Sequence, residues 1–217
     1  MKSGLAFRRR TFFLILLLGL CWLSAMSPLA IPDEEYHYRV SWFVSNCLLG
    51  RWDAPAMGYE RYFDFTGLCG HRNVPGGYAR LFGEFLPAAP RGALVPVLED
   101  VPRVYLPMYL PQAAGLALAR ALDLGFGGAF ALGRLANLTF YALCVCLAVR
   151  LAPPFGTCLF AAGALPMALH QAASFSYDPF LNGMALVFFA ALLRSLYGTG
   201  PLSRKEYAVL QIGRAHV

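Results

Sequence analysis

Long apolar runs separated by polar segments dominate the pattern along the chain. The first extends over Thr11–Ile31 behind a basic N-terminus, and three more follow over Gly128–Val149, Phe155–Ala173 and Pro179–Leu196. Each is close to the roughly 20 residues that an α-helix needs to cross a bilayer core. The pattern therefore predicts four transmembrane helices, the first over 11–31 and three within 128–196.

The first run differs from a cleaved signal peptide. A signal peptide has an apolar core of about 7–15 residues followed by a cleavage site between small residues. Here the run is longer and ends in Ser27-Pro28-Leu29-Ala30, which is a poor cleavage site. We therefore expect an uncleaved first span that follows a short N-terminal segment over 1–10.

The segment over 32–127 is polar and contains most of the acidic residues. Ten of the twelve Asp and Glu residues lie in it, together with frequent Gly and Pro. Tyr36–Leu49 is amphipathic, and Tyr105–Leu124 is mostly apolar but is interrupted by Pro111 and by polar residues. This pattern predicts a long loop outside the bilayer that contains short amphipathic helices.

Positive charges decide the placement of the stretch over 105–124. If it does not cross the membrane, Arg150, Arg194 and the basic residues after 200 lie on the same side as the N-terminal arginines. This arrangement agrees with the rule that Lys and Arg in loops favour the cytoplasmic side. We therefore expect an interfacial or re-entrant helix over 105–124, with the N-terminus and the segment over 197–211 in the cytoplasm.

Composition supports a membrane protein and argues against a nucleic-acid partner. The chain is 58% hydrophobic and 14% charged, whereas soluble domains have about 25% charged residues. The net charge of +6 comes from basic residues that flank apolar runs rather than from a basic cluster interleaved with aromatics. These residues are therefore interpreted as determinants of topology.

The last six residues, over 212–217, match the in-frame translation of a common sequencing-adapter read. Segments of this kind are excluded from reasoning about the fold. We expect these residues to be an artefact and the natural chain to continue past Leu210.

Four motifs resemble those of a bacterial family of membrane proteins. They are Pro32-Asp33-Glu34 with His37, Tyr109-Leu110-Pro111-Gln112, Gly133-Arg134-Leu135-Ala136-Asn137, and the segment from Pro166 to Asp178. Their identity and order resemble the family known as domain of unknown function 2142. That family in turn is similar to the membrane glycosyltransferases that use polyprenyl-phosphate sugars and place an acidic motif just after the first span.

The resemblance implies a fold and a function. The implied fold is an all-α multi-pass transmembrane helical bundle with a long outer loop containing short amphipathic helices, located in the bacterial cell membrane. The implied function is a cell-envelope glycosyltransferase acting on the outer face, with a polyprenyl-phosphate sugar donor, an envelope glycan acceptor and membrane lipid as partners. The implied function rests on an analogy between folds. A transporter or flippase and a non-catalytic assembly protein are therefore alternatives.

Three carboxylates are the candidate catalytic residues, because the predicted topology places Asp33, Glu34 and Asp178 on the outer face. A carboxylate there can deprotonate an acceptor hydroxyl or hold a divalent metal ion through hard oxygen ligands. The alternative is a helix start, since acidic residues stabilise the first turn and Pro32 and Pro179 are typical of it.

The candidate substrate-binding residues are His37, Arg134 and Gln171. His37 follows Asp33 by about one helical turn, so both can face one cleft. Arg134 can bind a lipid phosphate through two hydrogen bonds. In the alternative interpretation, His37 lies at the interface, Arg134 extends to the headgroups, and Gln171 satisfies backbone groups near a helix end.

Overall fold

The computed structural model describes residues 2–26, 28–29, 31–51, 56–59, 94–98 and 103–198. The tail expected to be an artefact, over 212–217, and all but two residues of the expected cytoplasmic segment over 197–211 lie outside these ranges.

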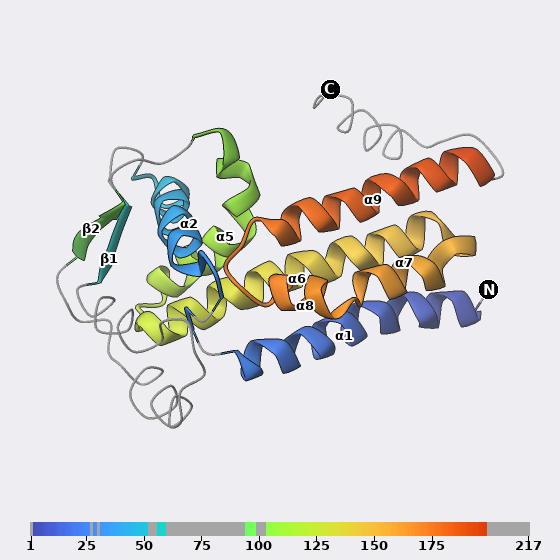
Figure 1. The fold of residues 1–217 in the computed structure, drawn as a ribbon, viewed down its shortest axis with the longest axis horizontal. Coiled ribbons are helices and arrows are strands. Elements are labelled where there is room, and N and C mark those ends of the chain that lie inside the picture. The colour runs from blue at the N-terminus through green and yellow to red at the C-terminus, as the bar shows by residue number, and fades with distance from the viewer. Residues whose placement is uncertain are drawn as a thin grey trace.

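Three long helices form the body of the molecule. They are α1 (Lys2–Ala25), α6 (Phe126–Leu151) and α9 (Asp178–Tyr197). They run alongside one another with α6 between α1 and α9, and α6 packs against both (Figure 1). The packed body is therefore helical, as expected.

Among the described residues, α6 and α9 are long and apolar enough to cross a membrane. Only 22% of the apolar window of α9 is buried, against 61% for α6. The central helix is thus covered by protein, whereas α9 exposes a large apolar face that suits lipid.

The first helix ends earlier than the sequence analysis expected. It stops at Ala25 rather than at Ile31. The chain then turns, with Leu29 in the left-handed region at φ 60° and buried. Pro28 explains part of the difference, because it lacks an N–H and disfavours the α conformation of the preceding residue.

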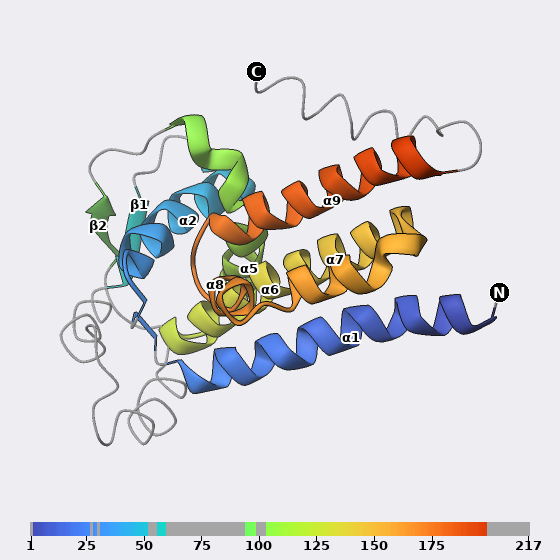
Figure 2. The ribbon, with the colours of Figure 1, turned by 45° about the vertical axis from the view of Figure 1, so that its right-hand side comes forward.

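The expected span over 155–173 is interrupted in the structure. It consists of a short 3₁₀ turn, η3 (Pro153–Phe155), followed by α7 (Gly156–Gly163) and α8 (Pro166–Ala172). Pro166 begins α8, and Leu165 before it is extended at ψ 135°, as expected for a residue before proline. Figure 2 shows α8 almost end-on while α7 runs along the body, so this segment changes direction rather than continuing as one rod.

Shorter elements gather at one end of the three long helices (Figures 1 and 2). They are α2 (Glu34–Leu48), the 3₁₀ helix η2 (Arg103–Tyr109) and α5 (Leu110–Ala121). With 12 residues, α5 is about 18 Å long at the usual helical rise, well short of the roughly 30 Å bilayer core. Because η2 leads directly into α5, the placement of the stretch over 105–124 outside the membrane stays a prediction.

Gly115 brings α5 close to α6. A Cβ atom at this position would lie 2.5 Å from the backbone oxygen of Leu132. The absence of a side chain therefore allows the backbones of the two helices to approach closely.

Two short strands were not anticipated. β1 (Ala56–Tyr59) and β2 (Leu94–Leu98) pair antiparallel, with Tyr59 opposite Leu94. Their pairing joins segments far apart in the chain, which local patterning does not reveal. The outer segment thus contains a two-stranded sheet in addition to the expected helices.

An aromatic cluster joins the end elements to the body. Tyr38 of α2 lies with its ring centroid 5.3 Å from Phe126, 5.5 Å from Phe130 and 5.3 Å from Phe175. Tyr38 and Phe175 are fully buried. This cluster holds α2 against α6 and against the loop that follows α8.

Candidate functional site

The 173–177 loop, which connects α8 to α9, is buried although it has no regular structure. Two amide side chains bind its backbone. Asn137 Nδ2 donates to the carbonyl oxygens of Ser174 (2.8 Å) and Ser176 (3.2 Å), and Gln112 Nε2 also donates to Ser176 O (3.1 Å). Buried carbonyls need such partners, so α5 and α6 together determine the path of this loop.

A buried ion pair between Glu34 and Arg134 fixes the same loop from the other side. Arg134 Nε donates to Glu34 Oε1 (2.8 Å) and Arg134 Nη2 to Oε2 (2.6 Å). The carboxylate also accepts from the backbone N–H of Phe175 (3.0 Å) and of Leu29 (3.0 Å), while Arg134 Nη1 donates to Met26 O (3.0 Å). The pair therefore ties together α2, α6, the turn after α1 and the 173–177 loop.

Burial changes the interpretation of two predicted site residues. Glu34 is 0% exposed and Arg134 2% exposed. Their charged groups are directed at each other and at backbone atoms, so neither presents a surface to a substrate. A charge removed from water requires such partners, and the tertiary structure supplies them within the chain.

The other predicted residues lie beside this buried pair, around a half-buried histidine. His37 Nδ1 is 2.8 Å from the hydroxyl oxygen of Tyr109, with which it shares a hydrogen bond. The ring of Tyr177 lies edge-on to His37, with centroids 5.3 Å apart. We call Asp33, His37, Tyr109, Tyr177 and Asp178 the acidic–aromatic site.

Burial and charge act in opposite directions on His37. Burial lowers the pKa of His37 below its usual value, and the nearby charges of Asp178, Asp33 and Glu34 offset this only in part. Burial also raises the pKa of Tyr109 above its usual value. At neutral pH the imidazole of His37 is therefore neutral and the phenol of Tyr109 is protonated.

Asp178 occupies the first turn of α9 without capping the helix. Tyr177 is the N-cap residue and makes no capping hydrogen bond through its side chain. The Asp178 carboxylate instead accepts a hydrogen bond from Gln171 Nε2 (2.8 Å), and Asn182 Nδ2 donates to Gln171 Oε1 (3.3 Å). Gln171 thus orients a predicted catalytic carboxylate, and Asn182 orients Gln171.

Asp33 begins α2 in an unusual conformation. It is the N-cap residue, with φ 59° and ψ 4°, and its side chain makes no capping hydrogen bond. Asp is among the few residues that tolerate this left-handed conformation. The side chain is exposed, so helix capping does not engage the Asp33 carboxylate.

One remaining prediction about this region concerns a divalent metal ion. Within the described residues, no group of three His, Cys, Asp or Glu side chains is placed to hold a metal ion. A divalent metal therefore stays a prediction.

The sequence did not assign four residues to the site, namely Tyr109, Tyr177, Gln112 and Asn137. For the two amides a signal exists, because a polar amide within an apolar helix often marks a functional position.

The four motifs that carry the family resemblance meet in space. Glu34 comes from the first, Gln112 from the second, Arg134 and Asn137 from the third, and the 173–177 loop from the fourth. Residues that are distant in the sequence therefore form one buried polar centre.

Comparison with known protein families gives a match to a family model. The model describes a predicted membrane protein (DUF2142) and matches residues 92–214, which include three of the four motifs. No curated protein and no solved structure matches the chain.

Proposed function

The chain belongs to the predicted membrane protein family DUF2142, and we propose that it is a cell-envelope glycosyltransferase that uses a polyprenyl-phosphate-linked sugar. The observation that carries this proposal is the acidic–aromatic site, where two carboxylates lie near a neutral histidine at one end of the bundle. The resemblance to glycosyltransferases with an acidic motif after the first span supports it.

The proposed reaction transfers a sugar from a lipid phosphate to a hydroxyl. The acceptor oxygen bonds to the anomeric carbon, the bond from that carbon to the phosphate oxygen breaks, and the hydroxyl proton goes to a base. We assign the base to Asp33, because its carboxylate is exposed and is not used for helix capping. We expect Asp178 and His37 to bind the sugar or acceptor hydroxyls, and Tyr109 to hold the imidazole in place.

The proposed location is the outer face of a bacterial cell membrane. Arg150 lies in the last turn of α6 and Arg194 in the last turn of α9, at the end opposite to α2 and α5 (Figure 1). Because basic residues favour the cytoplasmic side, this polarity supports an outward-facing acidic–aromatic site.

The test is replacement of Asp33 by Asn in the natural full-length protein. We expect Asp33→Asn to lower transfer by about a hundredfold to ten-thousandfold, the usual contribution of a general base, with normal protein level. Envelope-glycan analysis of a deletion strain complemented with each variant measures this effect. Glu35→Gln is the matched control, since it removes one negative charge from the same helix start and Glu35 pairs with Arg39 instead.

Asp178→Asn extends the test to the second carboxylate. We expect a loss between those of Asp33→Asn and Glu35→Gln, because Asp178 is oriented by Gln171 rather than exposed. Full complementation by Asp33→Asn at normal protein level would contradict the catalytic assignment.

A further inference from the structure

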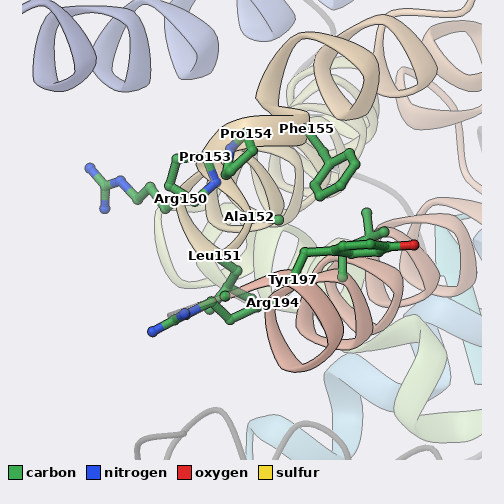
Figure 3. A pocket seen from close by; sticks show the side chains of 10 residues that line it. Arg150, Leu151, Ala152, Pro153, Pro154, Phe155, Arg194 and Tyr197 are labelled. Atoms are coloured by element: carbon green, nitrogen blue, oxygen red, sulfur yellow. The ribbon is translucent and has the colours of Figure 1, made fainter. Parts of the chain in front are cut away.

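A pocket lies at the end of the bundle opposite to the acidic–aromatic site. It forms where α6 turns into α7 and where α9 ends, and its volume is about 540 Å³ (Figure 3). Its lining comes from two segments, 150–155 and 193–198. This volume falls in the range of roughly 300–1,000 Å³ that is usual for small-ligand sites.

The pocket lining separates charge from aromatic surface. Figure 3 shows the side chains of Arg150 and Arg194 extending on one side, and the rings of Phe155 and Tyr197 on the other. The two rings lie with centroids 5.4 Å apart. Guanidinium groups match the geometry of phosphate oxygens, and aromatic rings suit the level of lipid headgroups.

Gly198 leaves the space in which the Arg194 guanidinium lies. A Cβ atom at Gly198 would be 1.9 Å from Arg194 Nη1. The Gly198 N–H also donates to the Arg194 carbonyl oxygen (3.0 Å). The guanidinium thus lies against the backbone at the end of α9, beside the pocket.

We propose that this pocket binds the phosphodiester headgroup of an anionic phospholipid from the membrane leaflet at this end of the bundle. The two arginines bind the phosphate, and the apolar lining from Leu151 and Leu193 contacts the glycerol and the upper acyl chains. Basic pockets between apolar helices on the cytoplasmic side recognise headgroups in this way. The inference concerns the opposite end from the proposed transferase site and does not depend on that activity.

The location of the pocket favours a lipid over free phosphate. The pocket lies at the ends of α6 and α9, which among the described residues are the helices long and apolar enough to span a membrane. A free phosphate would use the arginines but leave the apolar side of the pocket unfilled. A general attraction of basic residues to an anionic surface would involve Arg10 on α1 equally, because Arg10 is exposed. Arg10 lies outside the pocket, so it distinguishes this attraction from binding in the pocket.

The experiment measures binding to the purified full chain in a neutral detergent. Native mass spectrometry and thermal unfolding follow titrations with phosphatidylglycerol, phosphatidylcholine and inorganic phosphate. We expect saturable binding of phosphatidylglycerol, weakened roughly tenfold or more by Arg150→Gln or Arg194→Gln, as for loss of a charged hydrogen bond. Arg10→Gln, which removes the same charge outside the pocket, should bind like the unmodified chain.

Gly198→Ala separates geometry from net charge. It keeps every arginine, but its Cβ would meet the Arg194 guanidinium and would lie 2.3 Å from the Arg194 backbone oxygen, so the end of α9 must shift as well. We therefore expect weaker phosphatidylglycerol binding at unchanged net charge. Unfolding temperatures without lipid show whether each variant is folded. The proposal is overturned if Arg10→Gln weakens binding as much as the pocket variants, if the pocket variants bind normally, or if inorganic phosphate saturates the same arginines and the lipid binds no more tightly.

Discussion

At the scale of single residues, the Glu34–Arg134 pair determines how the rest of the site is held. Both Glu34 carboxylate oxygens accept from Arg134 and also from a backbone N–H. A buried pair of this kind contributes little net stability compared with an apolar replacement, but the loss of one partner leaves an uncompensated charge. The pair is therefore a positioning element whose disruption should be severe.

We expect Arg134→Met to lower the free energy of unfolding by about 3–5 kcal/mol, the usual cost of breaking a buried ion pair. The physical reason is the Glu34 carboxylate, which loses its two hydrogen bonds to Arg134. Adding Glu34→Gln should restore part of this stability. Unfolding in detergent, followed by circular dichroism, measures the three variants as a double-mutant cycle.

The control is the partly exposed pair between Arg39 and Glu35 on α2, whose side chains are 28% and 41% exposed. Glu35→Gln should change the unfolding free energy by less than about 1 kcal/mol, as for a surface ion pair. Strictly additive effects of Arg134→Met and Glu34→Gln would show that the buried pair is not coupled.

At the scale of elements, close packing of α6 against the 173–177 loop links the fold to the site. A Cβ atom at Gly133 would lie 2.3 Å from Phe175 Cζ. Phe175 is fully buried and its centroid is 4.8 Å from that of Phe130. The ring has little room to move, so the 173–177 loop depends on the absence of a side chain at position 133.

We expect Gly133→Ala to destabilise the protein by about 1–3 kcal/mol, the usual cost of overpacking, despite the gain in helix propensity. Displacement of Phe175 should also shift Asp178 and lower activity. Gly128→Ala on the same helix is the control, because the nearest atom to its Cβ, Leu124 Cβ, would be 3.3 Å away. Thermal unfolding and complementation compare the two, and equal stability would contradict the packing argument.

At the scale of the whole molecule, the acidic residues of the site and the arginines of the pocket lie at opposite ends of the long helices (Figure 1). Asp33, His37 and Asp178 lie with α2 at one end, and Arg150 and Arg194 lie at the other (Figure 1). Basic residues in loops favour the cytoplasmic side of a membrane, so we expect the end with Arg150 and Arg194 to face the cytoplasm. Arg39 on α2 and Arg120 on α5 lie at the other end.

We expect a membrane-impermeant thiol reagent applied from outside to label Leu122→Cys but not Pro153→Cys, in a chain whose native cysteines are replaced. Both positions are exposed. Leu122 lies between the end of α5 and the start of α6, and Pro153 follows the end of α6. Labelling of whole cells, with lysed cells as the control for reactivity, checks this orientation. Labelling of Pro153→Cys alone would invert it, and labelling of both in intact cells would mean that α6 does not cross.

The sequence by itself determined the helical character of the body, the long apolar helices α6 and α9, and the short amphipathic helix α2. Hydropathy and helix-start residues are local properties, so the start of α2 after Asp33 follows from neighbouring residues. The sequence did not predict the start of α8 at Pro166, which interrupts the span expected over 155–173. The motifs likewise identified the segments that meet at the site.

Only the tertiary structure decided which polar residues are partners and which are exposed. Glu34 and Asp33 are adjacent and chemically alike, yet Glu34 is buried against Arg134 and Asp33 is exposed. This difference depends on α6, a hundred residues away in the chain. The pairing of β1 with β2 and the burial of the 173–177 loop have the same origin, because long-range contacts leave no periodic signal in the local sequence.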